Sequence, residues 1–347
     1  MNRTLAQLLD DRAAELRARY GIAYRITGIA SRRLGWIADP NGVDPKKCGA
    51  GTPTREISPQ DPSPLPNGTL TTKIRIEDWL AAAQADVLFE ATSLNVENGQ
   101  PGVDHIRAAL NHGAHAITAN KGPIVHAYRE LRDLATRQGK RFLFESTVMD
   151  GVPIFSLFDQ LPAIRLQGFH GILNSTTNVI LSQMEEGLTF DEALKKAQEL
   201  GIAETDATHD IDGWDAAVKT AALITVLMGS NEDDVPIRLD QIVREGIRDL
   251  TPQAVRTAKR DGWAFKLVCR ARRTFFVDPR GVEVRGIEAS VRPEKVLSTQ
   301  PMAKISGTSS YIYFETDIFP GLAITEENPG LYATAYGMLA DFVRAVS

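Results

Sequence analysis

The stretch that decides the fold is ADVLFEATSLNVENGQPGVDHIRAALNHGAHAITAN, residues 85–120. Its two ends, ADVLFEAT and GAHAITAN, are short apolar runs that finish in small polar residues, as buried strands do. Between them, DHIRAALNHG repeats its apolar residues with the period of a helix. A strand, a helix and a second strand predict a parallel pair, because parallel strands need a crossover connection.

The same alternation extends on both sides of this stretch. A helical pattern over 123–139 leads into the short apolar run RFLFES at 141–146, and leucines at helical spacing predict a helix over 4–20. IAYRITGIAS at 22–31 is predicted to be a strand, and the seven prolines of residues 31–70 predict a long surface loop. The sequence therefore predicts an α/β fold with a Rossmann-type, doubly wound parallel sheet, whose ligands bind at the carboxyl ends of the strands.

Beyond residue 150 the pattern changes. A strand near GFHGILN at 168–174 precedes helices predicted over 176–187, 190–200 and 212–229, and β-rich sequence follows at 262–277 and 281–291. A last amphipathic helix over 329–346 is predicted to return to the first domain. We therefore expect two domains, a nucleotide-type domain of residues 1–150 with 321–347 and an α+β domain of residues 151–320.

The composition excludes several classes of protein. A net charge of −5 and the lack of a long basic run argue against a nucleic-acid partner. Cys48 and Cys269 are the two cysteines and stand far apart, so neither a disulfide framework nor a zinc site is expected. The first twenty residues lack the apolar region of a signal peptide, and no apolar window is long enough for a membrane helix. We expect a cytoplasmic protein.

The stretch GIAETDATHDIDGWDAAVK, residues 201–219, crowds five carboxylates into twelve residues and ends on a lysine. Asp212 is predicted to cap a helix with Asp215 in its first turn, because acids favour helix N-termini. Asp215 and Lys219 stand four residues apart on one helix face. This spacing is typical of a surface ion pair, but in a cleft the same lysine would be a proton donor. Glu204 and Asp206 precede the helix, and we expect them to hold something cationic.

The carboxylate-rich stretch of residues 201–219 resembles the signature of the homoserine dehydrogenase family. Three further motifs are similar to that family in the same order: TANKGP at 118–123, ESTVMDGVPIF at 145–155 and GILNSTTN at 171–178. The resemblance covers nearly the whole chain from residue 4 onward. It implies an NAD(P)-dependent oxidoreductase of amino-acid biosynthesis, in the aspartate pathway to threonine and methionine, that interconverts L-aspartate 4-semialdehyde and L-homoserine. It also implies that residues 1–150 with 321–347 bind the dinucleotide, and that residues 151–320 bind substrate and form a homodimer.

The resemblance implies roles for named residues. Lys219 would be the general acid and base, and Asp215 would orient it. The ligand's α-ammonium would bind Glu204. Asp210 and Thr176 would also contact the substrate. Lys121 would contact both the substrate and the cofactor.

Cofactor residues are expected in three places. Thr92 and Ser93 resemble family residues near the nicotinamide, and Gly330 matches a glycine on the cofactor side. Arg32 and Arg33 follow the strand predicted over 22–31, at a position where arginine favours a 2′-phosphate and an acid would favour a 2′-hydroxyl. We therefore predict a preference for NADP(H) over NAD(H).

The motif at 145–155 resembles the family's loop for a monovalent cation such as Na⁺. The ligands implied are the Glu145 side chain and the carbonyls of Val148, Asp150 and Val152. Oxygen ligands suit a hard cation. The alternative is a buried turn with Asp150 and Gly151 as its turn residues.

The chain departs from the family pattern at its start and at Ser175. Family members begin with a strand and a glycine-rich turn before the first helix, whereas this sequence opens with that helix at Met1. Ser175 stands where the family usually has glycine. We expect a short form without a kinase or regulatory domain. The alternatives are a truncated chain, or a non-catalytic relative that binds an amino acid but no dinucleotide.

Overall fold

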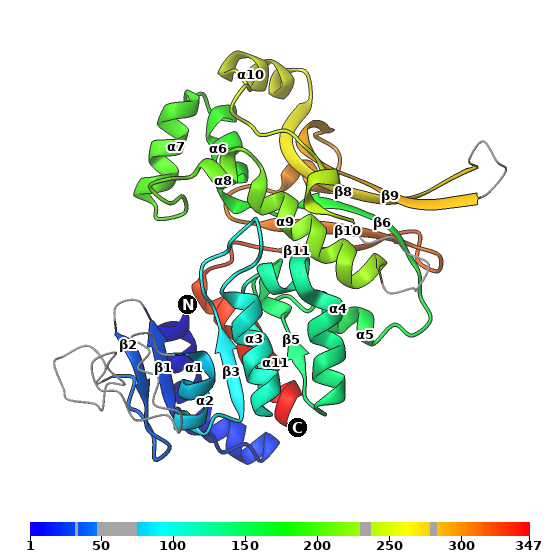
Figure 1. The fold of residues 1–347 in the computed structure, drawn as a ribbon. Helices are drawn as coiled ribbons and strands as arrows, with labels where there is room; N and C mark the ends of the chain where they lie inside the picture. Colours follow the sequence, from blue (N-terminus) through cyan, green and yellow to red (C-terminus); the bar gives the residue numbers. More distant parts are fainter. Residues whose placement is uncertain (32–33, 47–74, 230–236, 278–282) are drawn as a thin grey trace. The chain divides into compact units, whose positions relative to one another are not determined.

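The computed structural model describes residues 1–31, 34–46, 75–229, 237–277 and 283–347. These residues form two compact units (Figure 1). Unit 1 comprises Met1–Ser146 and Leu331–Ser347, and unit 2 comprises Thr147–Gly330. No helix among the described residues is long and apolar enough to cross a membrane.

Unit 1 is built on a parallel sheet in the order β3-β4-β5. Val87 of β3 lies beside His115 of β4, and Ala116 of β4 lies beside Phe142 of β5. The predicted α/β fold with a parallel sheet is confirmed. The elements of this unit are α1 (Asn2–Tyr20), β1 (Gly28–Ser31), β2 (Gly35–Ala38), α2 (Ile76–Ala83), β3 (Val87–Glu90), α3 (Gly102–His112), β4 (His115–Thr118), α4 (Gly122–Arg137), β5 (Phe142–Leu143) and α11 (Leu331–Val346).

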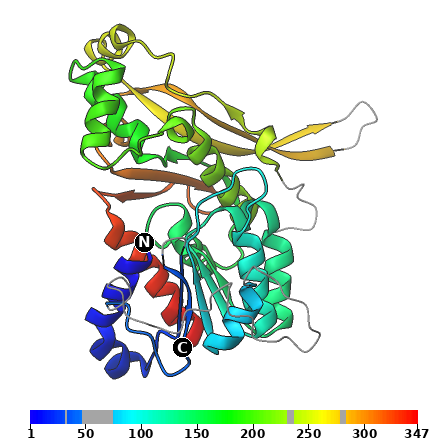
Figure 2. The same cartoon turned by 60° about the vertical axis from the view of Figure 1, so that its left-hand side comes forward.

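The core of unit 1 lies between the sheet and two helices from opposite ends of the chain. Figure 2 shows α11, in red, between α1 and the parallel strands. Successive side chains of a strand point to opposite faces, so Val87 and Phe89 of β3 reach the same cluster as Leu8 of α1 and Met338 of α11. The last helix therefore completes the core of unit 1.

The segment predicted as a strand over 22–31 is paired only at Gly28–Ser31. These residues form an antiparallel hairpin with β2, separate from the parallel sheet. Ile22 is buried and Tyr24 packs against the core around α1. Both side chains pack against the core as those of a strand would, which explains why the apolar pattern alone predicted a longer strand.

Unit 2 holds a six-stranded sheet in the order β11-β10-β6-β8-β9-β7. Its longest part is the antiparallel ribbon of β8 and β9, in which Trp263 pairs with Leu297 and Val277 with Glu283. The helices α6, α9 and α10 contact β8. The elements are α5 (Phe155–Asp159), β6 (Leu166–Ile172), α6 (Ser175–Glu185), α7 (Phe190–Glu199), α8 (Thr208–Ile211), α9 (Trp214–Leu223), β7 (Val243–Arg244), α10 (Pro252–Arg260), β8 (Trp263–Val277), β9 (Glu283–Leu297), β10 (Ser310–Thr316) and β11 (Leu322–Glu326), with 3₁₀ turns at Leu239–Gln241 and Pro301–Lys304. A further 3₁₀ turn, Glu145–Thr147, spans the boundary between the units.

The boundary near the C-terminus follows from strand pairing. β11 pairs antiparallel with β10, with Leu322 beside Phe314 and Glu326 beside Ser310. This pairing keeps residues up to Gly330 in unit 2, whereas the boundary predicted from the sequence lies at residue 320.

A buried carboxyl ties α11 to the end of the parallel sheet in unit 1. Asp341 is 1% exposed. Its Oδ2 accepts a hydrogen bond of 2.8 Å from the Glu145 amide, and its Oδ1 lies 3.2 Å from the Arg344 guanidinium. Burial raises the pKa of Asp341 to about 7, and the Glu145 amide and Arg344 oppose this only in part.

This pKa predicts an unusual pH dependence of stability. Between about pH 4 and pH 7 the folded chain keeps a proton on Asp341 that the unfolded chain releases, so this group favours folding at low pH and the contribution is lost as the pH rises toward 7. Asp341→Asn cannot titrate. As the pH rises from about 4 to 7, the free energy of unfolding of this variant should therefore increase relative to that of the wild type by about 1 kcal/mol per pH unit, as measured by urea denaturation. Exposed Asp133→Asn is the control, and a difference between D341N and wild type that does not change with pH would contradict the prediction.

Candidate active site

The carboxylate-rich segment 201–219 forms two helices. α8 ends at Ile211 and α9 begins at Trp214, with Gly213 between them at φ 80°, in the left-handed region that favours glycine. The helix predicted over 212–229 begins two residues later, at Trp214, and its last part is π-helical over Ile224–Met228, because α9 itself ends at Leu223. Asp212 is not its cap, and its carboxylate instead lies 3.2 Å from the Arg248 guanidinium.

The five acids of this segment separate into different environments. Asp206 is exposed, and its Oδ1 accepts a hydrogen bond of 3.1 Å from the Thr208 amide at the start of α8. Glu204 is exposed as well, and within the described ranges its carboxylate has no ion-pair partner. Only Asp210 and Asp215 come together.

The side chain of Asn174 joins these two acids. Its Nδ2 donates 2.8 Å to Asp210 Oδ1 and 3.1 Å to Asp215 Oδ2. Its Oδ1 accepts 2.9 Å from the Thr177 amide, so that Asn174 also caps α6. Burial raises the pKa of the Asp210 carboxyl, and the nearby charge of Asp215 raises it further.

Lys219 completes the cluster from the second turn of α9. Its Nζ donates 2.6 Å to the Leu173 carbonyl and lies 3.3 Å from Asp215 Oδ2. The two side chains are 17% and 20% exposed, so the pair is not an ordinary surface ion pair. Burial alone would lower the pKa of Lys219, but the charges of Asp215, Asp150 and Asp210 together hold it above its usual value.

Thr176 and Ser175 follow Asn174 in the first turn of α6. Thr176 is buried, and its hydroxyl lies 3.4 Å from the Ile202 carbonyl and also bonds to Asp210. The Ser175 hydroxyl donates 3.1 Å to the Thr308 carbonyl, so this side chain is turned toward another segment of unit 2. In unit 2, the structure therefore gathers Thr176, Asp210, Asp215 and Lys219 from the predicted set and leaves Glu204 at the surface.

In unit 1, polar side chains meet at the carboxyl ends of β3 and β4. Buried Glu90 accepts 2.8 Å from the Thr92 amide and 2.7 Å from the Thr118 hydroxyl. Asn120 Nδ2 donates 3.3 Å to the Thr92 hydroxyl, and Asn120 Oδ1 accepts from the Gly122 amide at the start of α4. This network fixes the loops that carry Thr92 and Lys121, which is where a sheet of this type binds nucleotides. The residues present therefore fit a dinucleotide at this end of unit 1.

Other predicted cofactor residues lie apart from this network. Ser93 is exposed, and Gly330, the last residue of unit 2, is exposed with open space where a Cβ would stand. Arg32 and Arg33 lie outside the described residues, as does Cys48.

The stretch predicted to hold a cation spans the boundary between the units. In unit 1, Glu145 Oε2 lies 3.4 Å from the Arg344 guanidinium. In unit 2, Val148 is buried, and Asp150 has φ 45° in a turn, as the buried-turn alternative requires. Over the described residues, no group of three or more histidine, cysteine or acidic side chains could hold a metal ion.

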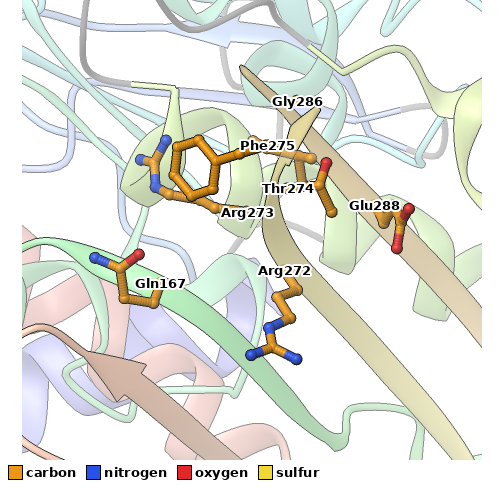
Figure 3. Close-up of a pocket in the computed structure, with 8 residues that line it drawn as sticks. Gln167, Arg272, Arg273, Thr274, Phe275, Gly286 and Glu288 are labelled. Carbon is orange, nitrogen blue, oxygen red and sulfur yellow. The ribbon is translucent and has the colours of Figure 1, made fainter. Parts of the chain in front are cut away.

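A hollow of about 790 Å³ lies elsewhere, on the β8–β9 ribbon of unit 2 (Figure 3). It is lined by strand residues that include Gln167, Arg272, Phe275 and Glu288. Arg273 in its wall donates to the carbonyls of Leu166 and Met228 and so connects neighbouring backbone segments. None of the predicted site residues lines this hollow.

Sequence reasoning missed three parts of these sites: Asn174, the Leu173 carbonyl and Glu90. The motif GILNSTTN contains the first two, and an asparagine before a helical pattern is a signal for a cap. No sequence signal connects Asn174 with acids 36 and 41 positions away.

Comparison with known proteins identifies relatives over the whole chain. Residues 2–145 match the family described as homoserine dehydrogenase, NAD binding domain, and residues 153–343 match the family described as homoserine dehydrogenase. An NAD(+)-dependent homoserine dehydrogenase from Pseudomonas canavaninivorans is 32% identical over 99% of this chain and 92% of its own length. A homoserine dehydrogenase from Methanocaldococcus jannaschii is 35% identical over 77% of this chain and 74% of its own.

Solved structures agree with these relatives. The crystal structure of a homoserine dehydrogenase from Thiobacillus denitrificans is similar with a TM-score of 0.76 and 28% sequence identity. The match covers 99% of this chain and 70% of that one.

The Asn174 bridge predicts a large effect of its removal. Asn174→Ala leaves Asp210 and Asp215 close together without their shared donor and uncaps α6. We expect the free energy of unfolding of this variant, measured in urea, to be about 1–3 kcal/mol lower than that of the wild type. Exposed Asn111→Ala on α3 is the matched control, and an N174A protein of wild-type stability would show that the bridge does not support the fold.

Proposed function

The chain belongs to the homoserine dehydrogenase family and is an oxidoreductase of that kind, and we propose that Lys219 is the group that moves the proton in its reaction. The observation that supports this role is the Asp215–Lys219 pair, whose Nζ is fixed between a carboxylate and the Leu173 carbonyl.

The chemistry follows from this geometry. In the direction of aldehyde reduction, the Lys219 ammonium would donate a proton to the substrate oxygen as the hydride reaches the aldehyde carbon. In the direction of homoserine oxidation, neutral Lys219 would take the hydroxyl proton. Two of the three N–H bonds of the ammonium point to Leu173 and Asp215, and the third would meet the substrate oxygen. The bound nicotinamide supplies or accepts the hydride.

We propose that the substrate's α-ammonium binds beside the acids of unit 2. Glu204, exposed and without an ion-pair partner in the described part of the chain, would take the ammonium. Thr176 and Asp210 would lie against the rest of the ligand. Lys121, after β4 of unit 1, would contact cofactor and substrate.

For the cofactor, the NAD-binding family match and the polar network around Glu90 support a nicotinamide dinucleotide on unit 1. We propose contacts from Thr92, Ser93 and Gly330, and a preference for NADP(H) through Arg32 and Arg33. We also propose a monovalent cation, held by the Glu145 side chain and the carbonyls of Val148, Asp150 and Val152.

The alternative of a non-catalytic relative is not favoured, because residues 2–145 match the NAD-binding domain of the family. Homoserine-dependent reduction of NADP⁺ by the purified chain, followed by nicotinamide absorbance, tests the function directly. Stabilisation by homoserine without turnover or any effect of NADP⁺ would support the alternative instead.

We further propose a homodimer formed through unit 2, in the cytoplasm. Apolar side chains stand open on its sheet, since Val243 is 63% and Phe275 59% exposed. Cys269 is a free thiol buried in unit 2, and burial raises its pKa to about 11. Light scattering of the purified chain tests the dimer.

The charge of Asp215 predicts a shift in the pH–rate profile. Oxidation of homoserine needs neutral Lys219, so the wild-type rate should rise with pH up to the elevated pKa of that lysine. Asp215→Asn removes the first of the three carboxylate charges that raise this pKa and leaves the burial that lowers it. The rising limb of the profile should therefore move to lower pH, with a loss of about tenfold or more in kcat at the optimum.

Steady-state kinetics between about pH 7 and pH 11 would measure this shift. Asp206→Asn lies in the same segment, and an asparagine Oδ1 can still accept the hydrogen bond from the Thr208 amide, so this control should keep the wild-type profile. An unchanged profile in D215N would remove Asp215 from the proposed mechanism.

The cofactor preference is tested by comparing kcat/KM for NADP⁺ and NAD⁺. We expect the wild type to favour NADP⁺, and the double variant R32A/R33A to lose this preference through a higher KM for NADP⁺, because the 2′-phosphate would lose its cationic partners. Arg25→Ala, outside the predicted pair, is the control. Equal efficiency of the wild type with both cofactors would contradict the prediction.

A further inference from the structure

Lys266 of β8 is a lysine buried in unit 2 that no proposed step of the reaction uses. Its side chain is 1% exposed. Its Nζ donates 2.6 Å to the Ile305 carbonyl and lies 3.4 Å from Asn178 Oδ1. Within the described ranges no carboxylate forms an ion pair with it, and Glu185 is the acid whose charge acts on it. Burial lowers the pKa of Lys266, and Glu185 offsets this in part. An ammonium buried in this way is costly and needs strong hydrogen bonds.

The bonds of Lys266 belong to a larger set that holds residues 305–309, a segment without helix or strand pairing. Asn178 Nδ2 donates 3.0 Å to the Gly307 carbonyl and 3.4 Å to the Ser309 carbonyl. The Ser175 hydroxyl donates 3.1 Å to the Thr308 carbonyl. Four backbone carbonyls of this segment are thus satisfied by three side chains, of which Ser175 and Asn178 lie in the first turn of α6.

The same turn of α6 carries the contacts to the acids of the candidate site. Asn174 caps the helix one residue before Ser175 and bonds to Asp210 and Asp215. The Leu173 carbonyl, which accepts from Lys219, precedes it. A shift of this turn would therefore move the partners of the Asp215–Lys219 pair, and small displacements of that kind have large effects on catalysis.

We propose that Lys266 is a positioning residue for the substrate-binding part of unit 2: it fixes segment 305–309 against the first turn of α6 and so holds Asn174 and Leu173 in place for Asp215 and Lys219. This inference rests on the function proposed above for those residues.

Lys266→Met keeps the length of the side chain and removes its charge and donors, and it tests the proposal in two ways. First, the KM for homoserine should rise about tenfold or more, while the KM for the dinucleotide stays within about twofold. Second, amide hydrogen exchange should speed up in peptides that cover 174–178 and 305–309, with the peptides of unit 1 unchanged.

Two further variants complete the test. Lys259→Met removes an exposed lysine of unit 2 that pairs with Glu186 and should change neither quantity. Lys266→Arg keeps the donors and the charge, and its KM for homoserine should lie between that of K266M and that of the wild type. Where K266M does not fold, Ser175→Ala removes one bond to the same segment and should give the same pattern at smaller size.

The outcomes separate the two proposals. A wild type that does not oxidise homoserine overturns the proposed function, and hydrogen exchange then decides the role of Lys266 alone. Faster exchange confined to 174–178 and 305–309 supports positioning. Exchange that rises evenly through unit 2, or a folded K266M protein with wild-type KM for homoserine, overturns it and leaves Lys266 as a residue of the core.

Discussion

The amide of Asn174, shared between two carboxylates, is the interaction on which the rest of the site in unit 2 depends. Two acids that lie together repel one another unless a donor or a cation stands between them. Here Asn174 supplies the donors and Lys219 supplies the cation. Because Asn174 also caps α6, the same side chain fixes the start of a helix and the spacing of the acids. The crowding of carboxylates in the sequence is thereby explained in part by hydrogen bonds and ion pairs within the chain, and in part by the amino-acid ligand that we propose.

In both units, buried polar side chains hydrogen-bond to loop segments whose backbone groups are not paired within a sheet or helix. In unit 1, Glu90 and Asn120 hold the loops that follow β3 and β4. In unit 2, Lys266 and Asn178 hold residues 305–309. Buried polar groups of this kind are costly when they lose a partner, so each one restricts the chain to a single arrangement at the place where a ligand is expected.

Local pattern was enough to predict the parallel sheet. The runs around β3 and β4 finish at the polar residues where the strands end, and the helical period between them is clear. The return of α11 to the first unit was also predicted from sequence. The length of the strand near residue 28 was not, because Ile22 and Tyr24 pack against the core without strand pairing, and an apolar pattern indicates packing but not pairing. The helix predicted from residue 212 begins two residues later, at Trp214, because Gly213 adopts a left-handed conformation at the N-cap and no periodicity reveals a backbone angle.

The site shows the same limit. The residue types at 210, 215 and 219 suggested their chemistry, but the contacts of Asn174 with Asp210 and Asp215, and the burial of Lys266, depend on segments that only the fold brings together. Arg32 and Arg33 lie outside the described residues, so the preference for NADP(H) still rests on sequence alone.

The most direct test of the central claim is chemical rescue of Lys219→Ala. Removal of the ammonium should lower the rate of homoserine oxidation by about 10²–10⁴-fold. Added primary amines should then restore turnover in proportion to their concentration, and amines of higher pKa should restore more, because they would take the proton that Lys219 takes in the wild type. A Lys219→Ala enzyme that oxidises homoserine at the wild-type rate would contradict the account.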